Sequence, residues 1–518
     1  MNFFQSHLAL TFLILWPLVG AIVAMVVPAQ SAKRVALGFG VVEMLAALPL
    51  FWSYDPVGAP FQNEVAVAWL PEWGIYYRIG LDGISLFMVM LTALLLPLMV
   101  LGSWTYIQSR ERVYYSMLLA LTTGVVGVFV ALDMFLFYVF WEMMLIPMYF
   151  LIGVWGGKER IYAAVKFFLY TTAGSLLMLV GIIYLFFRHE SLTGTASFAY
   201  ADFLQIPLTG TEQWWLFAAF ALAFAIKVPV FPFHTWLPAA HVQAPTAGSV
   251  ILAGVLLKMG TYGLLRFALP LFPLAATAEV TVTVFMILGL IGIIYTAMVA
   301  AVQPNSKKLV AYTSVAHLGF AILGIFAFNL QGIQGALVLM IAHGVSTPML
   351  FFLLGMLYER RHTYEIDDFG GLAASVPIFA TMLVFAGLAS IGLPGTSGFV
   401  SEFLVLIGTF QVRPWVALVA ATGVIFAAYY MLPMVQTMAF NKLDRPANRA
   451  IPDLGAREIA ILLPLVVVIL WIGIYPRPFL DRMEPAAVRL VEYMHGASSF
   501  APPPEPVAVA PIDSPSER

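Results

Sequence analysis

The chain has 518 residues, of which 62% are hydrophobic and 10% are charged, and its formal net charge is −2. Soluble domains carry about 25% charged residues, so this composition excludes a soluble protein and indicates one that crosses a membrane several times. The balanced charge and the lack of a basic run give no indication of nucleic-acid binding. Cysteine is absent, which excludes disulfides, thiolate zinc sites and cysteine-ligated iron–sulfur clusters.

Apolar segments follow one another along most of the chain, and about 20 such residues suffice for one helical crossing. The first segment has no basic n-region and no convincing cleavage site, so we expect a retained span rather than a signal peptide. The segments lie at 8–27, 34–52, 82–102, 114–132, 134–153, 162–187, 214–240, 246–268, 277–301, 307–328, 332–358, 373–411, 416–438 and 457–474. They predict an all-α polytopic membrane protein of about 14 transmembrane helices.

Two of these segments are interrupted. In 214–240, the string Lys227-Val-Pro-Val-Phe-Pro232 contains two prolines, each of which removes a backbone donor. Segment 373–411 is too long for one plain helix and is broken by Gly392-Leu-Pro-Gly-Thr-Ser-Gly398. Irregular backbone at membrane depth persists only where it is buried in protein or lines water, so both breaks are candidate transport sites.

The distribution of Lys and Arg predicts the orientation, because inner loops carry more of these residues than outer loops. More of the Lys and Arg residues fall in inner loops than in outer loops if the N-terminus is outside and segment 373–411 crosses once, as a discontinuous helix. We therefore expect both termini to lie outside. The Pro-rich stretch after residue 501 is expected to be disordered.

The broken helices, numbers 7 and 12, lie five segments apart. An odd offset inverts the second unit relative to the first, as in many secondary transporters, so we expect two inverted five-helix repeats. The expected division is 1–113 for helices 1–3, 114–268 for the first repeat, 277–438 for the second, inverted repeat, and 439–518 for helix 14 and a short C-terminal tail.

Several ionisable side chains lie near the middle of the apolar segments. A charge at the bilayer centre costs about 2.5–3.5 kcal/mol on insertion scales, and an apolar chain tolerates this cost mainly where the group moves protons or ions. From the helical rise, most of them lie about 12–18 Å from a membrane face. They are Glu142, Lys227, Lys258, His317, His343 and Glu402. Such a row in the membrane plane predicts lateral proton transfer between water-filled half-channels.

The residue types suit this chemistry. Burial favours the neutral forms of carboxyl and amine groups, and a nearby opposite charge favours the charged forms. A change in the distance between Glu142 and Lys227 can therefore switch Lys227 between charged and neutral, and Lys258 can then accept the proton. Histidines titrate near neutral pH and make good relays. Glu402 is the expected terminal acceptor.

Structural explanations compete with several of these assignments. A buried Glu–Lys pair can be purely structural, and packing explains His317 or His343 as well as a relay does. The two histidines can also ligate haem, although no second facing pair is evident.

Four further polar residues have simple explanations. Lys166 lies near the end of its segment, where snorkelling is expected. His234 and His241 can help a proton enter or serve in capping and loop packing. Asp133 lies at a helix junction, where an N-cap role is expected.

Six short motifs accompany this pattern. They are GLDGIS at 80–85, FWEMMLIP at 140–147, KVPVFPFHTWLP at 227–238, APT at 244–246, LKMG at 257–260 and GTSGFVSE at 395–402. Together they resemble the antiporter-like subunits of respiratory complex I, and the similarity spans the third to the thirteenth segment. That family also includes subunits of Mrp-type sodium/proton antiporters and of membrane-bound hydrogenases.

Two features resemble the branch of the family called subunit M or chain 4. Glu402 stands where the L and N branches would have lysine, and only a short Pro-rich tail is expected after Tyr475, where an L subunit would continue into a long lateral helix. The resemblance implies a proton-translocating subunit of NADH:quinone oxidoreductase. In such a subunit Glu142, Lys227, Lys258 and Glu402 carry protons, with the two histidines as intermediates.

The resemblance also implies that this chain holds no cofactor or metal. FMN, iron–sulfur clusters and quinone are expected on partner subunits, and no G-x-G-x-x-G motif follows a strand in this sequence. The expected partners are other membrane subunits, with L-type and N-type antiporter-like neighbours, and lipids. A bacterial plasma membrane is the expected location.

Two other functions compete with this one. A sodium/proton antiporter subunit of the Mrp type would share the pumping core and have no redox role. A stand-alone transporter of an organic solute fits less well, because few polar groups line the breaks. Co-purifying proteins distinguish the first alternative: flavin and iron–sulfur subunits indicate the oxidoreductase, and small antiporter subunits indicate the antiporter.

Overall fold

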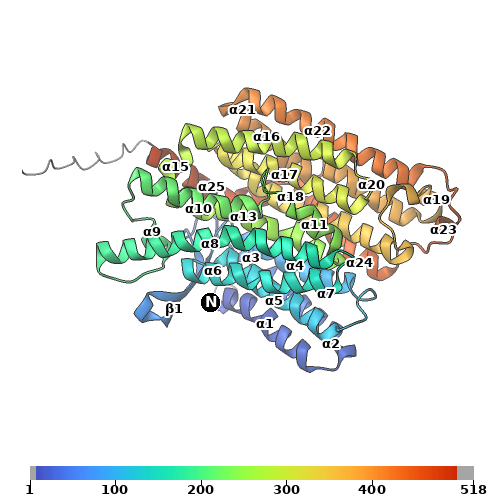
Figure 1. Cartoon of the computed structure of the whole chain (residues 1–518), viewed down its shortest axis with the longest axis horizontal. Coiled ribbons are helices and arrows are strands. Elements are labelled where there is room, and N and C mark those ends of the chain that lie inside the picture. The colour runs from blue at the N-terminus through green and yellow to red at the C-terminus, as the bar shows by residue number, and fades with distance from the viewer. Residues whose placement is uncertain (1–7, 499–518) are drawn as a thin grey trace, which may run out of the picture.

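The computed structural model describes residues 8–498, which form a bundle of helices aligned roughly along the long axis of the molecule (Figure 1). Within that range, eleven helical stretches are long and apolar enough to cross a membrane. They are α1 (Leu8–Val26), α2 (Ala29–Ala47) with α3 (Leu50–Ser53), α5 (Glu111–Val130), α6 (Met134–Met143) with α7 (Leu145–Trp155), α8 (Arg160–Thr193), the stretch Thr246–Leu271, α16 (Glu279–Ala301), α17 (Ser306–Phe326), α18 (Leu330–Arg361), α22 (Pro414–Val435) with a π-helical end, and α24 (Ala456–Ile474).

Four further apolar helices are shorter or less hydrophobic, and they include the helices that end at the two predicted breaks. They are α4 (Leu86–Gly102), α10 (Gly210–Lys227), α20 (Pro377–Ile391) and α21 (Ser397–Val412). The remaining short helices are α9 (Tyr200–Phe203), α11 (Trp236–Gln243), α15 (Pro273–Thr277), α19 (Leu372–Ser375) and α23 (Pro446–Arg449). Every predicted apolar segment contains helix, so the predicted all-α polytopic class is confirmed.

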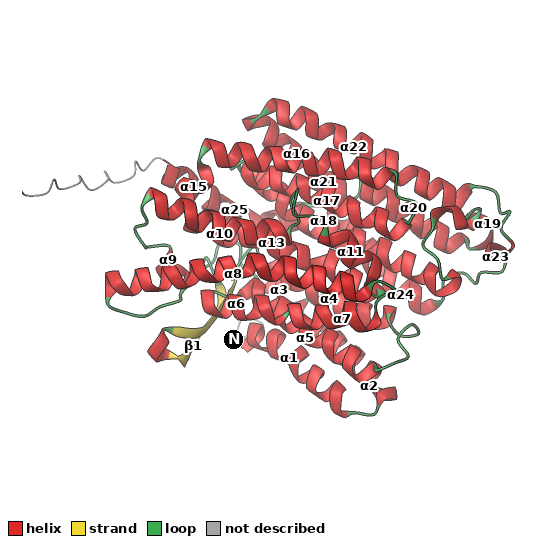
Figure 2. Ribbon diagram, viewed as in Figure 1, coloured by secondary structure: helices red, strands yellow, loops and turns green. Residues whose placement is uncertain are grey.

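The sequence missed a two-stranded antiparallel sheet. Strands β1 (Gln62–Leu70) and β2 (Ile75–Leu81) pair between α3 and α4. Figure 2 shows them in yellow at the end of the bundle where α1 begins. The turn between the strands contains Gly74 at φ +64°, a backbone conformation that glycine adopts without strain.

The expectation of only a short Pro-rich tail after Tyr475 was wrong. A 22-residue helix, α25 (Arg477–Ser498), follows there, and it packs on α15 and α18. Its apolar residues Met483, Ala487 and Met494 are buried against the bundle, which stabilises it although its composition is mixed. The stretch expected to be disordered lies outside the described residues.

Both predicted helix breaks are present. Helix α10 ends at Lys227 and α11 begins at Trp236, whose indole Nε1 donates to the carbonyl of Ile226 at 2.9 Å. Helix α20 ends at Ile391, Gly392 adopts φ +85°, and α21 begins at Ser397. A side-chain donor and a left-handed glycine thus accommodate the ends of α10 and α20 inside the protein.

The stretch Thr246–Leu271 is wholly buried and irregular in a way the sequence did not indicate. It consists of α12 (Thr246–Ile251), α13 (Leu257–Gly263) and α14 (Leu269–Leu271), separated by π-helical turns at Leu252–Leu256 and Leu264–Ala268. Such π turns widen the helix and occur frequently at functional sites.

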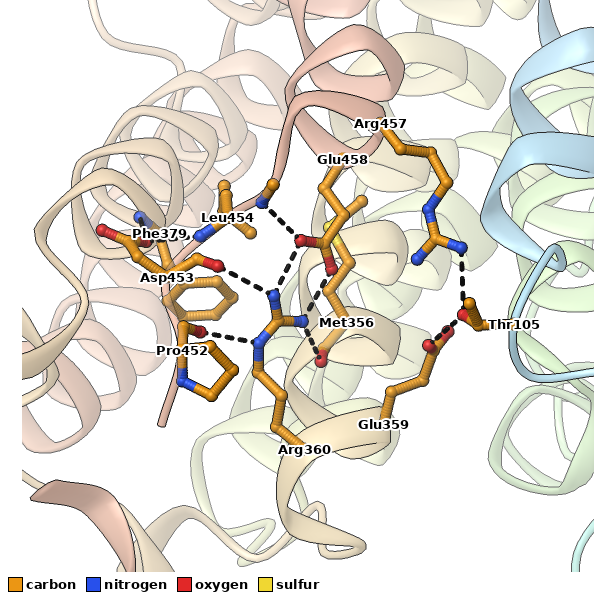
Figure 3. A network of polar contacts seen from close by, with 11 residues as sticks. Thr105, Met356, Glu359, Arg360, Phe379, Pro452, Asp453, Leu454, Arg457 and Glu458 are labelled. Carbon is orange, nitrogen blue, oxygen red and sulfur yellow. Dashed lines mark hydrogen bonds and ion pairs between the residues drawn. The ribbon is translucent and has the colours of Figure 1, made fainter. Parts of the chain in front are cut away.

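Helix α18 is the other wholly buried span, and an arginine at its end fixes it to α24 (Figure 3). Arg360 donates from Nη1 and Nη2 to the two carboxylate oxygens of Glu458, at 2.6 and 2.7 Å. It also donates to the carbonyls of Met356, Pro452 and Asp453. This bidentate, charge-assisted pair holds the connection before α24 against the end of α18.

Candidate functional site

The six predicted residues come from six different helices. Glu142 lies on α6, Lys227 ends α10, and Lys258 lies on α13 between the two π turns. His317 and His343 lie on α17 and α18, and Glu402 lies on α21, shortly after the second break. The structure brings the last four together and keeps the first two apart from them.

Lys258 and His343 form the first buried contact of this group. Lys258 is fully buried, and its Nζ lies 2.6 Å from Nδ1 of His343. The same Nζ donates to the carbonyl of Ala253, five residues earlier in the π turn. The π turn therefore supplies an acceptor to the lysine inside a wholly buried span, and His343 can share its proton.

His317 and Glu402 form the second buried contact. Nδ1 of His317 lies 2.7 Å from Oε1 of Glu402, and both side chains are nearly inaccessible. Nε2 of His317 lies 3.4 Å from the hydroxyl of Ser390, at the end of α20. A Cβ on Gly392 would lie 3.4 Å from Oε2 of Glu402, so the break in the helix borders the carboxyl group.

The two contacts are joined through the histidine rings. The ring centroids of His317 and His343 lie 5.7 Å apart, with a tilt of 56°. This spacing is short enough for proton transfer through one bridging water molecule or after a ring rotation. Lys258, His343, His317 and Glu402 thus form one chain of titratable groups, which we call the four-residue chain.

Lys227 has apolar and aromatic surroundings. It is buried, its Nζ lies 3.5 Å from Sδ of Met144, and the same atom lies 5.4 Å from the ring centroids of both Trp141 and Phe167. The ring faces can stabilise a cation by their quadrupoles.

Glu142, the predicted partner of Lys227, interacts with it electrostatically but is not among the ion pairs formed within residues 8–498. Its carboxyl lies beside the hydroxyls of Tyr138 and Ser175, and its Oε1 accepts no hydrogen bond from the described residues. The predicted Glu142–Lys227 pair is therefore two groups that interact without direct contact.

The sequence did not indicate that two further titratable groups are buried. Lys307, the first residue of the predicted segment 307–328, is buried and donates from Nζ to the carbonyl of Ala244 at 2.6 Å. His241 is fully buried, and its ring stacks on that of Phe351 with centroids 4.6 Å apart. It is close enough to Lys258 and Lys307 to interact with them electrostatically. The Ala244-Pro245 turn beside both was the available signal.

A buried ion pair was also missed. Arg266, near the end of the predicted segment 246–268, pairs with Asp82 of the GLDGIS motif, and both side chains are almost inaccessible. The hydroxyl of Tyr262 lies 3.4 Å from Nε of Arg266. The pair joins the end of the Thr246–Leu271 stretch to the start of α4.

Asp133 has the predicted N-cap role, and the position of Lys166 fits the predicted snorkelling. The Asp133 side chain accepts from the backbone N–H groups of Phe135 and Leu136 at 3.0 Å and caps α6 as predicted. Lys166 is partly exposed and lies over the ring of Tyr162. Among residues 8–498, no group of three or more His, Asp or Glu side chains is arranged to hold a metal ion.

Comparisons with known proteins show the family. Residues 131–427 match the family described as NADH:quinone oxidoreductase/Mrp antiporter, TM, and residues 68–127 match NADH-ubiquinone oxidoreductase chain 4, amino terminus. The NADH-quinone oxidoreductase subunit M of Rhodobacter capsulatus is 46% identical over 477 residues, which are 90% of this chain and 91% of that protein.

Two solved structures share the fold. A chain of respiratory complex I from Thermus thermophilus with bound NADH has a TM-score of 0.86 at 32% identity, covering 94% of this chain and 99% of that one. A chain of the Mrp complex from Dietzia sp. DQ12-45-1b has a TM-score of 0.81 at 21% identity, covering 96% and 100%, and shows the fold alone. The buried row of titratable groups, the broken helices and these similarities lead to one conclusion: the chain belongs to the NADH:quinone oxidoreductase/Mrp antiporter family of membrane subunits, on the branch of subunit M and chain 4.

Proposed function

We propose that this chain is a proton-translocating membrane subunit of an NADH:quinone oxidoreductase. The observation that carries the proposal is the four-residue chain, in which buried groups able to exchange protons touch or nearly touch from Lys258 to Glu402. Burying four such groups in an apolar bundle is costly unless they act on protons or ions. NADH, flavin, iron–sulfur and quinone chemistry takes place on other subunits.

The proposed order of transfer follows the geometry. Glu142 controls the charge of Lys227 by approaching or leaving it, and Lys227 passes its proton toward Lys258. Lys258 shares the proton with His343 through their 2.6 Å contact, and His317 delivers it to Glu402 through the 2.7 Å contact. The driving force arrives from a neighbouring subunit as a shift in charge at Glu142 or Lys227.

The backbone segments that carry Lys227 and Lys258 approach each other closely. A Cβ on Gly260 would lie 2.7 Å from the backbone nitrogen of Val228 and 2.8 Å from the carbonyl of Phe224. The break after Lys227 therefore packs directly against the helix that carries Lys258. A water molecule at this break is the bridge we propose.

The proposed architecture has 14 crossings, with the breaks after Lys227 and Ile391 at corresponding places in two inverted repeats, 114–268 and 277–438. The start of α1 and the end of α25 lie at the same end of the bundle (Figure 1), which supports an even number of crossings. We propose that this end faces outward from a bacterial plasma membrane. L-type and N-type subunits are the proposed neighbours.

The test uses inverted membrane vesicles that contain the assembled complex. NADH-driven quinone reduction and proton uptake are compared between the parent and Lys258→Ala. Both rates are expected to fall together, because the four-residue chain loses its first member. If both are unchanged in an assembled complex, the oxidoreductase assignment fails.

The second candidate is an Mrp-type sodium/proton antiporter subunit, because the matching family model covers both kinds of protein. Sodium-dependent proton movement without NADH, together with co-purification of small antiporter subunits rather than flavin subunits, is the result that would replace the first proposal.

A further inference from the structure

A further buried ionisable side chain, Glu43, belongs to neither the predicted row nor the four-residue chain. Glu43 on α2 is 0% exposed, and neither carboxylate oxygen has a hydrogen-bond partner among the described residues. In the span Ala29–Ser53 it lies about 21 Å from one end and about 15 Å from the other, at about 1.5 Å per residue. A carboxylate so placed would be costly in its charged form.

Glu43 lies on the face of α2 that packs inward. The buried residues of this helix are Ala32, Ala36, Gly40, Glu43 and Ala47, spaced as one helical stripe. The other members are alanine or glycine, so the neighbouring helix approaches closely. Glu43 is the one polar member of this stripe.

The facing helix is α4, and three contacts fix its antiparallel alignment with α2. Nζ of Lys33 lies 5.2 Å from the ring centroid of Trp104, just beyond the end of α4. A Cβ on Gly40 would lie 3.2 Å from the backbone nitrogen of Pro97. Further along, Met44 lines the same cavity of about 140 Å³ as Phe87. Interpolation between these contacts sets Glu43 opposite Ala93 and Leu94.

At this level one carbonyl of α4 lacks its regular helical donor. Proline has no N–H group, so Pro97 cannot donate to the carbonyl of Ala93 as another helical residue at that position would. That carbonyl points along the helix toward Pro97, and the Glu43 side chain leans back toward Gly40. Two polar groups without regular partners thus lie at the same level on facing helices. A carboxylate would repel the carbonyl oxygen, whereas a protonated carboxyl can donate to it.

The described surroundings of Glu43 offer no other charge at its level. Helices α1, α3, α4 and α5 pack on α2, and the first three contain no ionisable residue. The ionisable residues of α5 lie within its first five positions, and those of α2 itself lie nine or more residues before Glu43. They are Glu111, Arg112, Tyr114, Tyr115, Lys33 and Arg34. Within residues 8–498 no ion pair includes Glu43, and the residues lining the adjacent cavity are apolar.

We propose that Glu43 is a permanent proton-binding site, a protonated carboxylic acid that donates to the Ala93 carbonyl, directly or through one water molecule. This bond clamps α2 to α4 beside Pro97 and lies outside the path of the translocated protons. The proposal does not rest on the function proposed above, because it requires a fixed proton rather than a moving one.

Infrared difference spectra of the assembled complex, parent minus Glu43→Gln, test the protonation. The expected difference is loss of a carboxylic-acid carbonyl band that shifts in D₂O. Loss of carboxylate bands instead would overturn the proposal. Glutamine has the size of the protonated acid and keeps a hydrogen-bond donor, so this variant removes the titratable group with little change in packing.

Two further measurements test the clamp and its place outside the path. Glu43→Gln is expected to keep the thermal midpoint of the complex and its proton uptake per NADH, whereas Glu43→Leu, which has no donor, lowers the midpoint. Equal midpoints for the two variants would overturn the clamp. Loss of proton uptake in Glu43→Gln, with NADH oxidation retained, would overturn the fixed-proton assignment.

Discussion

The Glu142–Lys227 region and the four-residue chain are built from the same kinds of side chain but are connected differently. In the four-residue chain, two short contacts of 2.6 and 2.7 Å join the groups in pairs, and the two histidine rings adjoin. In the Glu142–Lys227 region, the lysine contacts a thioether and two aromatic rings, and the glutamate lies apart from it.

From this difference we propose a division of labour. Groups already in contact can exchange a proton without large movement, so the four-residue chain is suited to conduction. A lysine whose nearest neighbours are weak acceptors depends on the distance of Glu142 for its charge, so the first region is suited to control. Four sets of substitutions distinguish these two roles.

The largest effect is expected in the Glu142–Lys227 region, which we call the controlling region. Lys227→Ala and Glu142→Ala should each lower NADH-driven proton uptake by about tenfold or more, since each removes a group on which proton transfer depends. The measurement is proton uptake in inverted vesicles, normalised to the amount of assembled complex. Mild effects equal to that of Lys166→Ala would remove the distinction between this region and an ordinary lysine position.

A smaller loss is expected when the four-residue chain is cut in its middle. His317→Gln keeps a polar side chain beside Glu402 but cannot titrate, so proton uptake should fall by about threefold to tenfold. His189→Gln is the matched control, because His189 is also largely buried but bonds to the carbonyl of Thr195 outside the row. Equal losses in both variants would indicate packing roles for both histidines.

A modest effect is expected from the contact between Lys227 and Met144. Met144→Leu keeps the volume but removes the sulfur acceptor, and soft sulfur contacts contribute little individually, so uptake should change by about twofold. The fully buried Met148 is one turn away, and Met148→Leu is the control. A larger change in the control than in Met144→Leu would show that packing, rather than the contact with Nζ, sets the effect.

The smallest effect is expected at Lys166. This side chain is partly exposed and lies over Tyr162, where its flexible stem lets the charge reach the membrane surface. Lys166→Ala should leave proton uptake per NADH within about 1.5-fold of the parent. A loss comparable to that of Lys227→Ala would add Lys166 to the controlling region.

Local features were well predicted because they depend on neighbours in the chain. Asp133 caps α6 since its side chain reaches the N–H groups two and three residues on. The breaks after Lys227 and Ile391 follow from proline and glycine, which restrict or free the backbone wherever they occur. The β1–β2 hairpin and α25 were missed, because hydropathy identifies segments that can cross a membrane and neither element is such a segment.

The sequence by itself determined that the chain is a helical membrane protein, where its apolar segments lie, and which titratable residues they contain. Hydropathy and proline or glycine content act residue by residue, so they can be read without a fold. Only the tertiary structure decided that Lys258 meets His343, that His317 meets Glu402, and that Glu142 stands apart from Lys227. It also decided that Lys307 and Glu43 are buried, because burial and contact depend on which helix faces of distant segments pack together.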